Sequence, residues 1–582
     1  MPRWALPLPF GSASSCFDAR AASGLCHAVM SHKTWCKRRQ GRSERIIKRI
    51  VAIGDEFLLP LRIGEEVALA GAMELRLLRG AAEIWGFRLS GAPAKVVVPP
   101  WAPAPRLLAM RSSNEVEMEK ELPEVQKYLE LRKWPVIVAL RSQNVRDALA
   151  SPAQRARLTA HRAWPSIIEH FQKHCIDFSS FDNPAVLLVM GPKGVGKSTC
   201  CRYLVNRLLS KVPEVYFLET DLGQPELGPP GVVTLHRLTE PLLRPPHAEQ
   251  HGHDRVAAYF AGTVTPQTHP ALYTASVAAA FEVYKERIKD CRPAPPLMVN
   301  SHGWVTGLGL EMLQQIVATV GAQLVVRLQV GTPERKVKAE DGKLKRAERS
   351  SLSRCGPLAL ALGKHKRGHE GEVIPNPRAS LVLVDVESAV PEGSAAPLAV
   401  QLRWLRMAQH FKPRLDPCRP ATAMAIQDFF EDVPRWRVPM GCLSFGLVAG
   451  HLLPNELEAT LTGTVVALCS VEATEPHEFL EPHEAPIQFL AYAFVHSFDC
   501  KAREVVIYSS ICLEKLKSAN LLLRGEVTWE PNTTRNLQLG DGRLSPLQPY
   551  SAPWLLEGMG VGTRVISTKS RGHLRRRLIR KL

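Results

Sequence analysis

Short apolar runs alternate with helix-like segments through the central part of the chain. The apolar runs predict buried strands at residues 185–190, 214–221, 296–300, 323–330 and 380–386. After the first run, apolar side chains recur at the spacing of one helix face, namely Cys201, Leu204, Val205, Leu208 and Leu209. Strands that alternate with helices in this way predict a parallel sheet covered on both faces.

The pattern changes on both sides of this region. Residues 50–112 form short alternating runs between glycine-containing turns and predict a small N-terminal β domain, and residues 435–570 predict a β-rich C-terminal domain. The other expected segments are a disordered basic N-terminal extension (1–49), a linker and helical lead-in (113–184), a central α/β domain (185–388) with a basic lid or insert at about 334–370, a Pro-rich connector (389–434) and a basic tail (571–582).

Residues 191–198 read GPKGVGKS and fit the phosphate-loop pattern G-x-x-x-x-G-K-[ST]. A predicted strand precedes the run and a predicted helix follows it, which is the context that this loop requires. Such a loop directs backbone N–H groups and the positive end of the helix toward one point. The expected fold class is therefore α/β: a P-loop NTPase core with a parallel sheet, flanked by the N-terminal β domain and the β-rich C-terminal domain.

The phosphate loop supplies the first candidate site residues. Lys197 is expected to bridge the β- and γ-phosphate oxygens, and the Ser198 hydroxyl to bind Mg²⁺. Thr199 either caps the helix or assists Ser198. Lys193 either contacts phosphate or extends into solvent. The full predicted phosphate-binding set is Gly191, Pro192, Lys193, Gly194, Val195, Gly196, Lys197, Ser198 and Thr199.

A second segment places a carboxylate at the end of a strand. Asp221 follows the apolar run at 214–221, at the sheet edge where ligands bind in open α/β sheets. It can serve as a metal ligand or accept a proton from an attacking hydroxyl, whereas the structural alternative is an Asp that caps a turn. Gln224 is a weaker candidate, because the Gly and Pro residues around it also suit an ordinary turn.

A third segment runs from a strand into a glycine-containing loop at residues 300–307. Asn300 ends the strand where many phosphate-loop proteins carry an Asp, so the acidic metal partner is assigned to Asp221. Trp304 either stacks on a nucleobase or belongs to the core. His302 is interpreted as a satisfied polar loop residue.

Composition narrows the class of protein. The net charge of +18 favours a polyanionic partner. The alternative is that the basic residues serve only as a targeting segment. They are concentrated at 33–49, 335–367 and 571–582. The 13 cysteines contain no CxxC pair, which argues for reduced thiols rather than a zinc ribbon or a disulfide scaffold. No apolar run reaches the 18 residues typical of a transmembrane helix, so no membrane partner is expected. An N/T-K-x-D guanine signature, an HExxH motif and a GxSxG elbow are also lacking.

Four segments together resemble the polynucleotide 5′-hydroxyl kinases: GPKGVGKSTCCRYLVNRLLS, FLETDLGQPELGPPGVVTL, YFAGTVTPQTHPALY and LMVNSHGWVTGLGLEML. The most similar branch is the nucleolar kinase of pre-ribosomal RNA processing, which IYSSICLEKLKSANLLLRGEVTWEP near the C-terminus also resembles. Its sister branch is the kinase subunit of the pre-mRNA cleavage machinery. The resemblance implies transfer of the γ-phosphate of ATP, with Mg²⁺, to the 5′-hydroxyl end of RNA.

The resemblance also implies roles for individual residues. Lys197 and Ser198 take the phosphate and metal roles, and Asp221 serves as metal ligand and orients or deprotonates the 5′-hydroxyl. The expected RNA-binding residues are Gln224, Thr263, Thr265, Gln267 and Trp304, with Trp304 stacked on the terminal nucleotide. The lid candidates are Arg346, Arg349 and Arg354, in a stretch that matches the family loosely.

The leading hypothesis is an ATP-dependent RNA 5′-kinase of pre-rRNA processing in the nucleus and nucleolus, with a nuclease or scaffold protein as partner. An organelle is the alternative location if residues 1–45 are a transit peptide rather than a disordered arm. The rival functions are a catalytically silent ATP-binding scaffold and an ATPase that acts on a protein or a small substrate.

Overall fold

A computed structural model describes residues 49–99, 102, 104–111, 133–142, 164, 167–169, 171, 184–248, 252–329, 382–387, 399–414, 430, 433–450, 452–471, 479–480 and 485–527. The predicted lid arginines Arg346, Arg349 and Arg354 lie outside these residues, as do the N-terminal extension through residue 48 and the basic tail. Within the described part, no helix is both long enough and apolar enough to cross a membrane.

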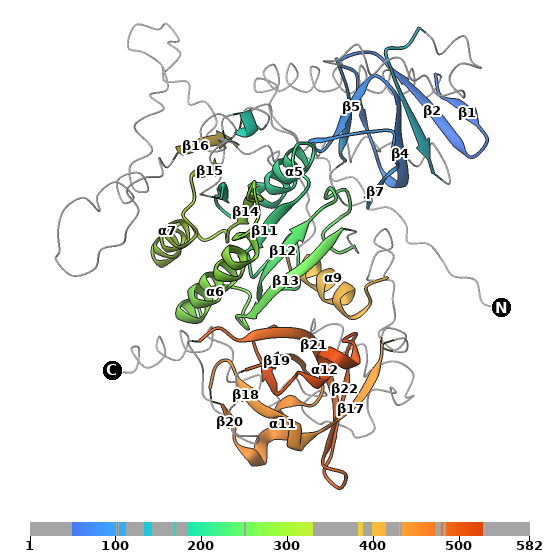
Figure 1. The fold of residues 1–582 in the computed structure, drawn as a ribbon. Coiled ribbons are helices and arrows are strands. Elements are labelled where there is room, and N and C mark those ends of the chain that lie inside the picture. The colour runs from blue at the N-terminus through green and yellow to red at the C-terminus, as the bar shows by residue number, and fades with distance from the viewer. Residues whose placement is uncertain are drawn as a thin grey trace, which may run out of the picture.

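The N-terminal region forms two antiparallel sheets around one apolar cluster (Figure 1). One sheet has the order β1 (Val51–Ile53), β2 (Glu56–Leu61), β9 (Val136–Arg141), β4 (Gly71–Arg79) and β7 (Ala94–Val98). The other has the order β3 (Glu66–Ala68), β8 (Arg106–Met110), β5 (Ala81–Ile84) and β6 (Phe87–Arg88). The sequence analysis assigned residues 136–141 to the linker, but β9 lies between β2 and β4 at the centre of the first sheet.

The central region confirms the α/β class and the five predicted parallel strands. They are arranged in the order β16 (Val382–Glu387), β15 (Leu324–Gln329), β10 (Val186–Met190), β14 (Leu297–Asn300) and β11 (Val215–Glu219). The register pairs Val189 with Asn300 in β14, and Asn300 with Glu219 in β11. The C-terminal ends of three neighbouring strands therefore meet at one edge of the sheet.

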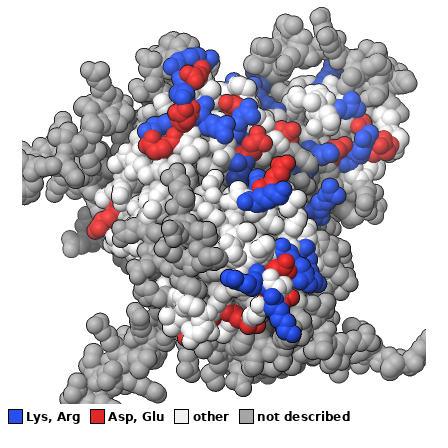
Figure 2. All heavy atoms as spheres, turned by 60° about the horizontal axis from the view of Figure 1, so that its bottom comes forward, with Lys and Arg blue, Asp and Glu red and all other residues white. Residues whose placement is uncertain are grey.

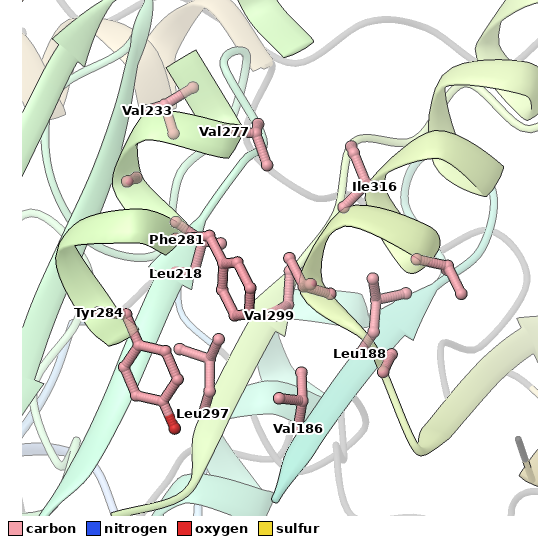
Figure 3. Packing of buried hydrophobic residues seen from close by; sticks show 14 of the residues in the cluster. Val186, Leu188, Leu218, Val233, Val277, Phe281, Tyr284, Leu297, Val299 and Ile316 are labelled. Atoms are coloured by element: carbon pink, nitrogen blue, oxygen red, sulfur yellow. The ribbon is translucent and has the colours of Figure 1, made fainter. Parts of the chain in front are cut away.

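Helices cover both faces of the central strands, which explains why β10 is continuously apolar. Val186 and Leu188 of β10 pack against α6 (Pro270–Ile288) and α7 (Leu308–Val320), as Figure 3 shows. Leu187 and Val189 point to the opposite face and join the cluster that includes α5 (Lys197–Leu209). Since successive side chains of a strand alternate in direction, a strand buried on both sides has no polar position to interrupt its apolar run.

The sheet continues beyond the predicted parallel strands. β12 (Val232–Leu238) and β13 (His253–Phe260) add antiparallel to β11, and β13 then pairs with β21 (Gln488–Asp499). From β21 the order continues through β19 (Val465–Ser470), β23 (Leu521–Arg524), β18 (Ser444–Leu447) and β20 (Phe479–Leu480), while β22 (Glu504–Tyr508) and β17 (Arg435–Pro439) extend β21 on a branch. The short helices of this part are η5 (Met440–Cys442), η6 (Pro454–Glu456), α11 (Leu457–Leu461) and α12 (Leu513–Lys517). One mixed sheet thus links the central and C-terminal regions, which the sequence pattern predicted as separate domains.

Helix α9 (Ala399–Phe411) lies at the junction between the central and C-terminal strands (Figure 1). Met407, Ala408 and Phe411 pack in the same buried cluster as Phe260 of β13 and Tyr492 of β21. The backbone N–H of Tyr492 donates a 2.9 Å hydrogen bond to Nε2 of His410. The helix therefore contacts both halves of the sheet where they meet.

Charged side chains are mixed on the face that Figure 2 shows, where described Lys and Arg residues lie among Asp and Glu residues. The basic clusters at 335–367 and 571–582 belong to segments outside the described residues. Recognition of a polyanion by the described part of this face must therefore depend on local groups rather than on a broad basic surface.

Acid should weaken the junction through His410. Burial lowers the pKa of His410 to about 3, so between that value and about pH 6.5 the unfolded chain binds a proton that the folded chain does not. Stability should therefore fall as the pH drops from 6.5, by about 1.4 kcal/mol per pH unit from this group. We expect the thermal midpoint of His410→Gln to fall less steeply between pH 7.5 and 5 than that of the wild type. Equal slopes would contradict this account, whatever the offset between the two proteins at pH 7.5.

Candidate active site

The phosphate loop connects β10 to α5 with glycine at its strained positions. Gly191, Gly194 and Gly196 have φ values of +151°, +81° and +94°, which L side chains rarely adopt. A Cβ atom on Gly191 would also lie only 2.5 Å from the carbonyl oxygen of Leu328 in β15. The glycine pattern thus follows from backbone conformation and close packing.

The loop leaves backbone donors available at the start of the helix. Gly196 is the N-cap of α5, and no side chain caps the helix there. The N–H groups of Lys193, Gly194 and Gly196 donate to no acceptor among the described residues. Unpaired N–H groups at a helix N-terminus form a binding site for anions such as phosphate. The predicted phosphate-binding set thus occupies the conformation that its role requires.

Lys197 lies inside this loop. Its side chain is buried, and Nζ donates a 3.2 Å hydrogen bond to the carbonyl oxygen of Pro192. Burial lowers the pKa of Lys197, and the charges of Asp221, Cys201 and Glu219 partly offset this effect. Lys197 and Asp221 are therefore close enough to interact electrostatically, as the sequence analysis required.

Asn300 connects the phosphate loop to β11. Its Nδ2 lies 3.4 Å from Oγ of Ser198 and 2.9 and 3.0 Å from the two carboxylate oxygens of Glu219. The thiol of Cys201 donates to Oδ1 of Asn300 at 3.6 Å. Because β14 lies between β10 and β11, this amide fills the position between the phosphate loop and the acidic strand end.

Glu219 is a site residue that the sequence analysis did not assign. Its side chain is fully buried, and burial together with the charge of Asp221 raises its pKa to about 8, against the lowering effect of hydrogen bonds from Asn300 and two backbone N–H groups. Those N–H groups belong to Asp221 and Glu226, at 2.8 and 2.5 Å. The only signal in the sequence was its place at a strand end, since its register with Asn300 arises only in the folded sheet. Glu219 fixes the course of the chain immediately after β11.

Asp221 is the accessible carboxylate of the pair. It is partly exposed, and its Oδ1 accepts hydrogen bonds from the N–H groups of Gly223 and Gln224 at 3.0 and 3.1 Å. The predicted turn-capping role and the predicted chemical role are thus compatible. The turn occupies Oδ1 and orients the carboxylate, while Oδ2 has no hydrogen bond to another described residue.

The loop at residues 262–268 lies beside Asp221. A Cβ atom on Gly223 would approach the carbonyl oxygen of Val264 to 2.9 Å, so the two loops are in contact. Thr263 is buried, and its hydroxyl donates to the carbonyl oxygen of Thr265 at 2.5 Å, within the loop itself. Thr265 is partly exposed and Gln267 is exposed. Thr265 and Gln267 are therefore better placed than Thr263 to contact a ligand.

The loop after β14 lies on the other side of the phosphate loop. A Cβ atom on Gly303 would lie 3.0 Å from both Cα and the backbone N of Lys193. Trp304 is partly buried, and its ring covers Gly309, where an added Cβ would lie 2.4 Å from ring atoms. Trp304 thus packs against the core beside α7 and keeps part of its surface exposed, while its stacking on a base stays a prediction.

His302 departs from the sequence interpretation. Its Nδ1 accepts a 3.3 Å hydrogen bond from the Trp304 N–H, but its buried Nε2 has no hydrogen-bond partner among the described residues. Burial, and secondarily the charge of Lys197, lowers its pKa to about 4. The side chain is therefore a neutral, only partly satisfied group next to the phosphate loop.

Comparison with known proteins agrees with this geometry. Residues 191–354 match the family model described as "mRNA cleavage and polyadenylation factor CLP1 P-loop". The chain is 33% identical over 193 residues to the human polynucleotide 5′-hydroxyl-kinase NOL9. This match covers 33% of this chain and 25% of that protein. It is 25% identical over 358 residues to the Danio rerio NOL9, and this match covers 60% of this chain and 47% of that protein. It is also 27% identical over 321 residues to the polynucleotide 5′-hydroxyl-kinase grc3 of Aspergillus niger, and this match covers 48% of this chain and 39% of that protein.

Solved structures support the same fold. The wild-type Clp1p–Pcf11p (454–563) complex matches 82% of this chain and 99% of the matched chain, with a TM-score of 0.50 and 13% identity. The segments matched in the curated relatives named above span less than half of each relative's own length. Residues 191–354 therefore match a P-loop domain of the CLP1 type, in a chain similar to the polynucleotide 5′-hydroxyl kinases NOL9 and grc3, and the resemblance expected from the sequence is confirmed.

Proposed function

We propose that the protein is an ATP-dependent polynucleotide 5′-hydroxyl kinase that phosphorylates the 5′ end of RNA. The observation that supports this most directly is the partly exposed carboxylate of Asp221, whose charge acts on Lys197 in the phosphate loop. A site that only binds nucleotide needs the phosphate loop. It does not need an accessible carboxylate held beside that loop.

ATP would be bound through its phosphates by the unpaired N–H groups of the loop and by Lys197. The Ser198 hydroxyl and the Asp221 carboxylate, as hard oxygen ligands near the β- and γ-phosphates, suit Mg²⁺. A metal held there would offset the charge of the phosphates. The buried lysine gains a partner when the anionic phosphates arrive, which offsets the cost of its burial.

Asp221 would orient the 5′-hydroxyl and accept its proton. The 5′ oxygen forms a bond to the γ-phosphorus, the bond between this phosphorus and the β–γ bridging oxygen breaks, and ADP leaves. Glu219 does not fit the base role, because it is fully buried and three groups already hydrogen bond to its oxygens. The partly exposed Asp221 keeps one oxygen available.

The terminal nucleotide would lie between the loops on either side of the phosphate loop. Trp304 would stack on its base, while Thr265, Gln267 and Gln224 would contact the strand, and the buried Thr263 would shape the loop from within. The similarity to NOL9 and grc3 supports a role in pre-rRNA processing in the nucleolus, with an RNA-processing nuclease or scaffold as partner.

The function is tested by incubating the protein with Mg²⁺, γ-labelled ATP and a 5′-hydroxyl oligoribonucleotide. Labelled RNA is the expected product. ATP that is bound but not consumed would instead identify a scaffold, and phosphate release that is independent of RNA would identify an ATPase.

Asp221→Asn should reduce labelling by about 10²–10⁴-fold, the usual contribution of a general base. Asn retains an Oδ1 that can accept the Gly223 and Gln224 N–H groups, so the turn and the fold should persist. The thermal midpoint serves as the control for folding, and Lys197→Ala should abolish transfer. Wild-type labelling by Asp221→Asn would exclude the proposed base.

Trp304→Ala should raise the apparent KM for RNA by about 5–150-fold, since stacking on one base is worth about 1–3 kcal/mol. The KM for ATP should stay unchanged. Trp304→Phe keeps an aromatic face over Gly309 and should recover part of the affinity. An unchanged KM for RNA in the Ala variant would rule out stacking.

A further inference from the structure

Helix α9 presents two arginines to the loop that carries Asp221. Arg406 is buried and donates hydrogen bonds to the carbonyl oxygens of Pro225 and Glu226, and to that of Pro246. Arg403 precedes it by three residues and therefore lies on the same side of the helix, one turn closer to its start. Because Arg406 fixes this side of the helix against residues 225 and 226, Arg403 is directed toward the beginning of the same loop.

Arg403 is close enough to Asp221 for their charges to interact, but no ion pair or hydrogen bond joins them. Burial lowers the pKa of Arg403 and the charge of Asp221 partly offsets this effect. Arg403 is only half-buried, and within the described ranges it makes no hydrogen bond or ion pair. A guanidinium has five N–H donors in a planar fork, and a partly buried one without an acceptor is suited to an incoming anion.

The charge of Asp221 acts on Lys197 of the phosphate loop and on Arg403 of α9. It partly offsets the lowering of the pKa that burial causes in each of them. The nucleotide would occupy the Lys197 side of Asp221. Helix α9 contacts the chain that follows Asp221, at residues 225 and 226, so Arg403 would face the acceptor side.

The neighbours of Arg403 agree with this placement. Trp404 of α9 and Val264 of the loop at 262–268 both pack against the buried cluster that joins the central and C-terminal strands. Gly223 brings that same loop into contact with the Asp221 turn. Helix α9 and the loop at 262–268 thus border the Asp221 turn on a common side.

We propose that Arg403 binds the first internucleotide phosphate of the acceptor strand. The inference rests on the proposed kinase function, because it places the 5′-hydroxyl at Asp221. The first charged group beyond that hydroxyl is the phosphodiester on the 3′ side of the terminal nucleotide. A planar guanidinium can hold two oxygens of such a group at once, which fixes the strand relative to the carboxylate. Arg403 is accordingly a positioning residue that discriminates a polynucleotide end from a free nucleoside.

The test compares three 5′-hydroxyl oligonucleotides: one with natural linkages, one with a neutral methylphosphonate at the first linkage, and one with it at the second. Binding is measured by fluorescence anisotropy, and phosphorylation is measured separately as kcat/KM. For the wild type, the first-linkage substitution should weaken binding by about 10–100-fold, as expected for lost charge-assisted hydrogen bonds. The second-linkage substitution should have a much smaller effect.

Arg403→Gln keeps a long polar side chain and should weaken binding of the natural strand to a similar extent. It should then show no further loss with the first-linkage methylphosphonate, because the two changes remove one contact. Arg414→Gln removes an exposed positive charge just beyond the same helix and should keep the full sensitivity to that linkage. Arg403→Lys should recover only part of the affinity, because an ammonium cannot bind the phosphate as a planar fork.

Equal sensitivity to the first linkage in Arg403→Gln and the wild type would overturn the inference. So would a wild type that is insensitive to that linkage. If the linkage-specific binding is present but label never reaches the RNA, the Arg403 contact stands and the kinase function fails.

Discussion

The side-chain amide of Asn300 holds together the groups on which this site depends. It donates to both oxygens of Glu219 and approaches the Ser198 hydroxyl, so it connects the start of α5 to the end of β11 across the strand between them. Glu219 in turn fixes the backbone of Asp221 and Glu226. An Asp at position 300 would place a second carboxylate against the buried Glu219, where like charges repel at close range. An amide fills this position without adding charge.

The second constraint is the continuity of the sheet. β12 and β13 extend the central strands until β13 meets β21, and α9 packs across this junction. The backbone N–H of Glu526 donates to the carbonyl oxygen of Gly262 at 2.6 Å, so the C-terminal strands also support the loop beside Asp221. The predicted C-terminal domain thus contributes directly to the surroundings of the site.

The sequence predicted the central strands and the phosphate loop because their signals are local. Apolar runs mark strands buried on both faces, and the glycines of the loop occupy positions with positive φ. It did not predict the role of Glu219 or of Asn300, because their significance arises from the register of two strands about 80 residues apart in the chain. It also missed α9, which lies in a Pro-rich stretch and whose arginines gain meaning only from the loop they contact. The roles of Thr265, Gln267 and the lid arginines remain predictions.

The central claim is that Asp221 lies between the nucleotide and the acceptor strand. A structure of the protein with ADP, Mg²⁺ and a 5′-hydroxyl oligoribonucleotide tests this claim most directly. We predict that the 5′ oxygen lies within hydrogen-bond reach of an Asp221 carboxylate oxygen, about 2.6–3.2 Å, on the side away from Lys197. A 5′ end bound elsewhere, or an Asp221 side chain directed away from it, would contradict the account.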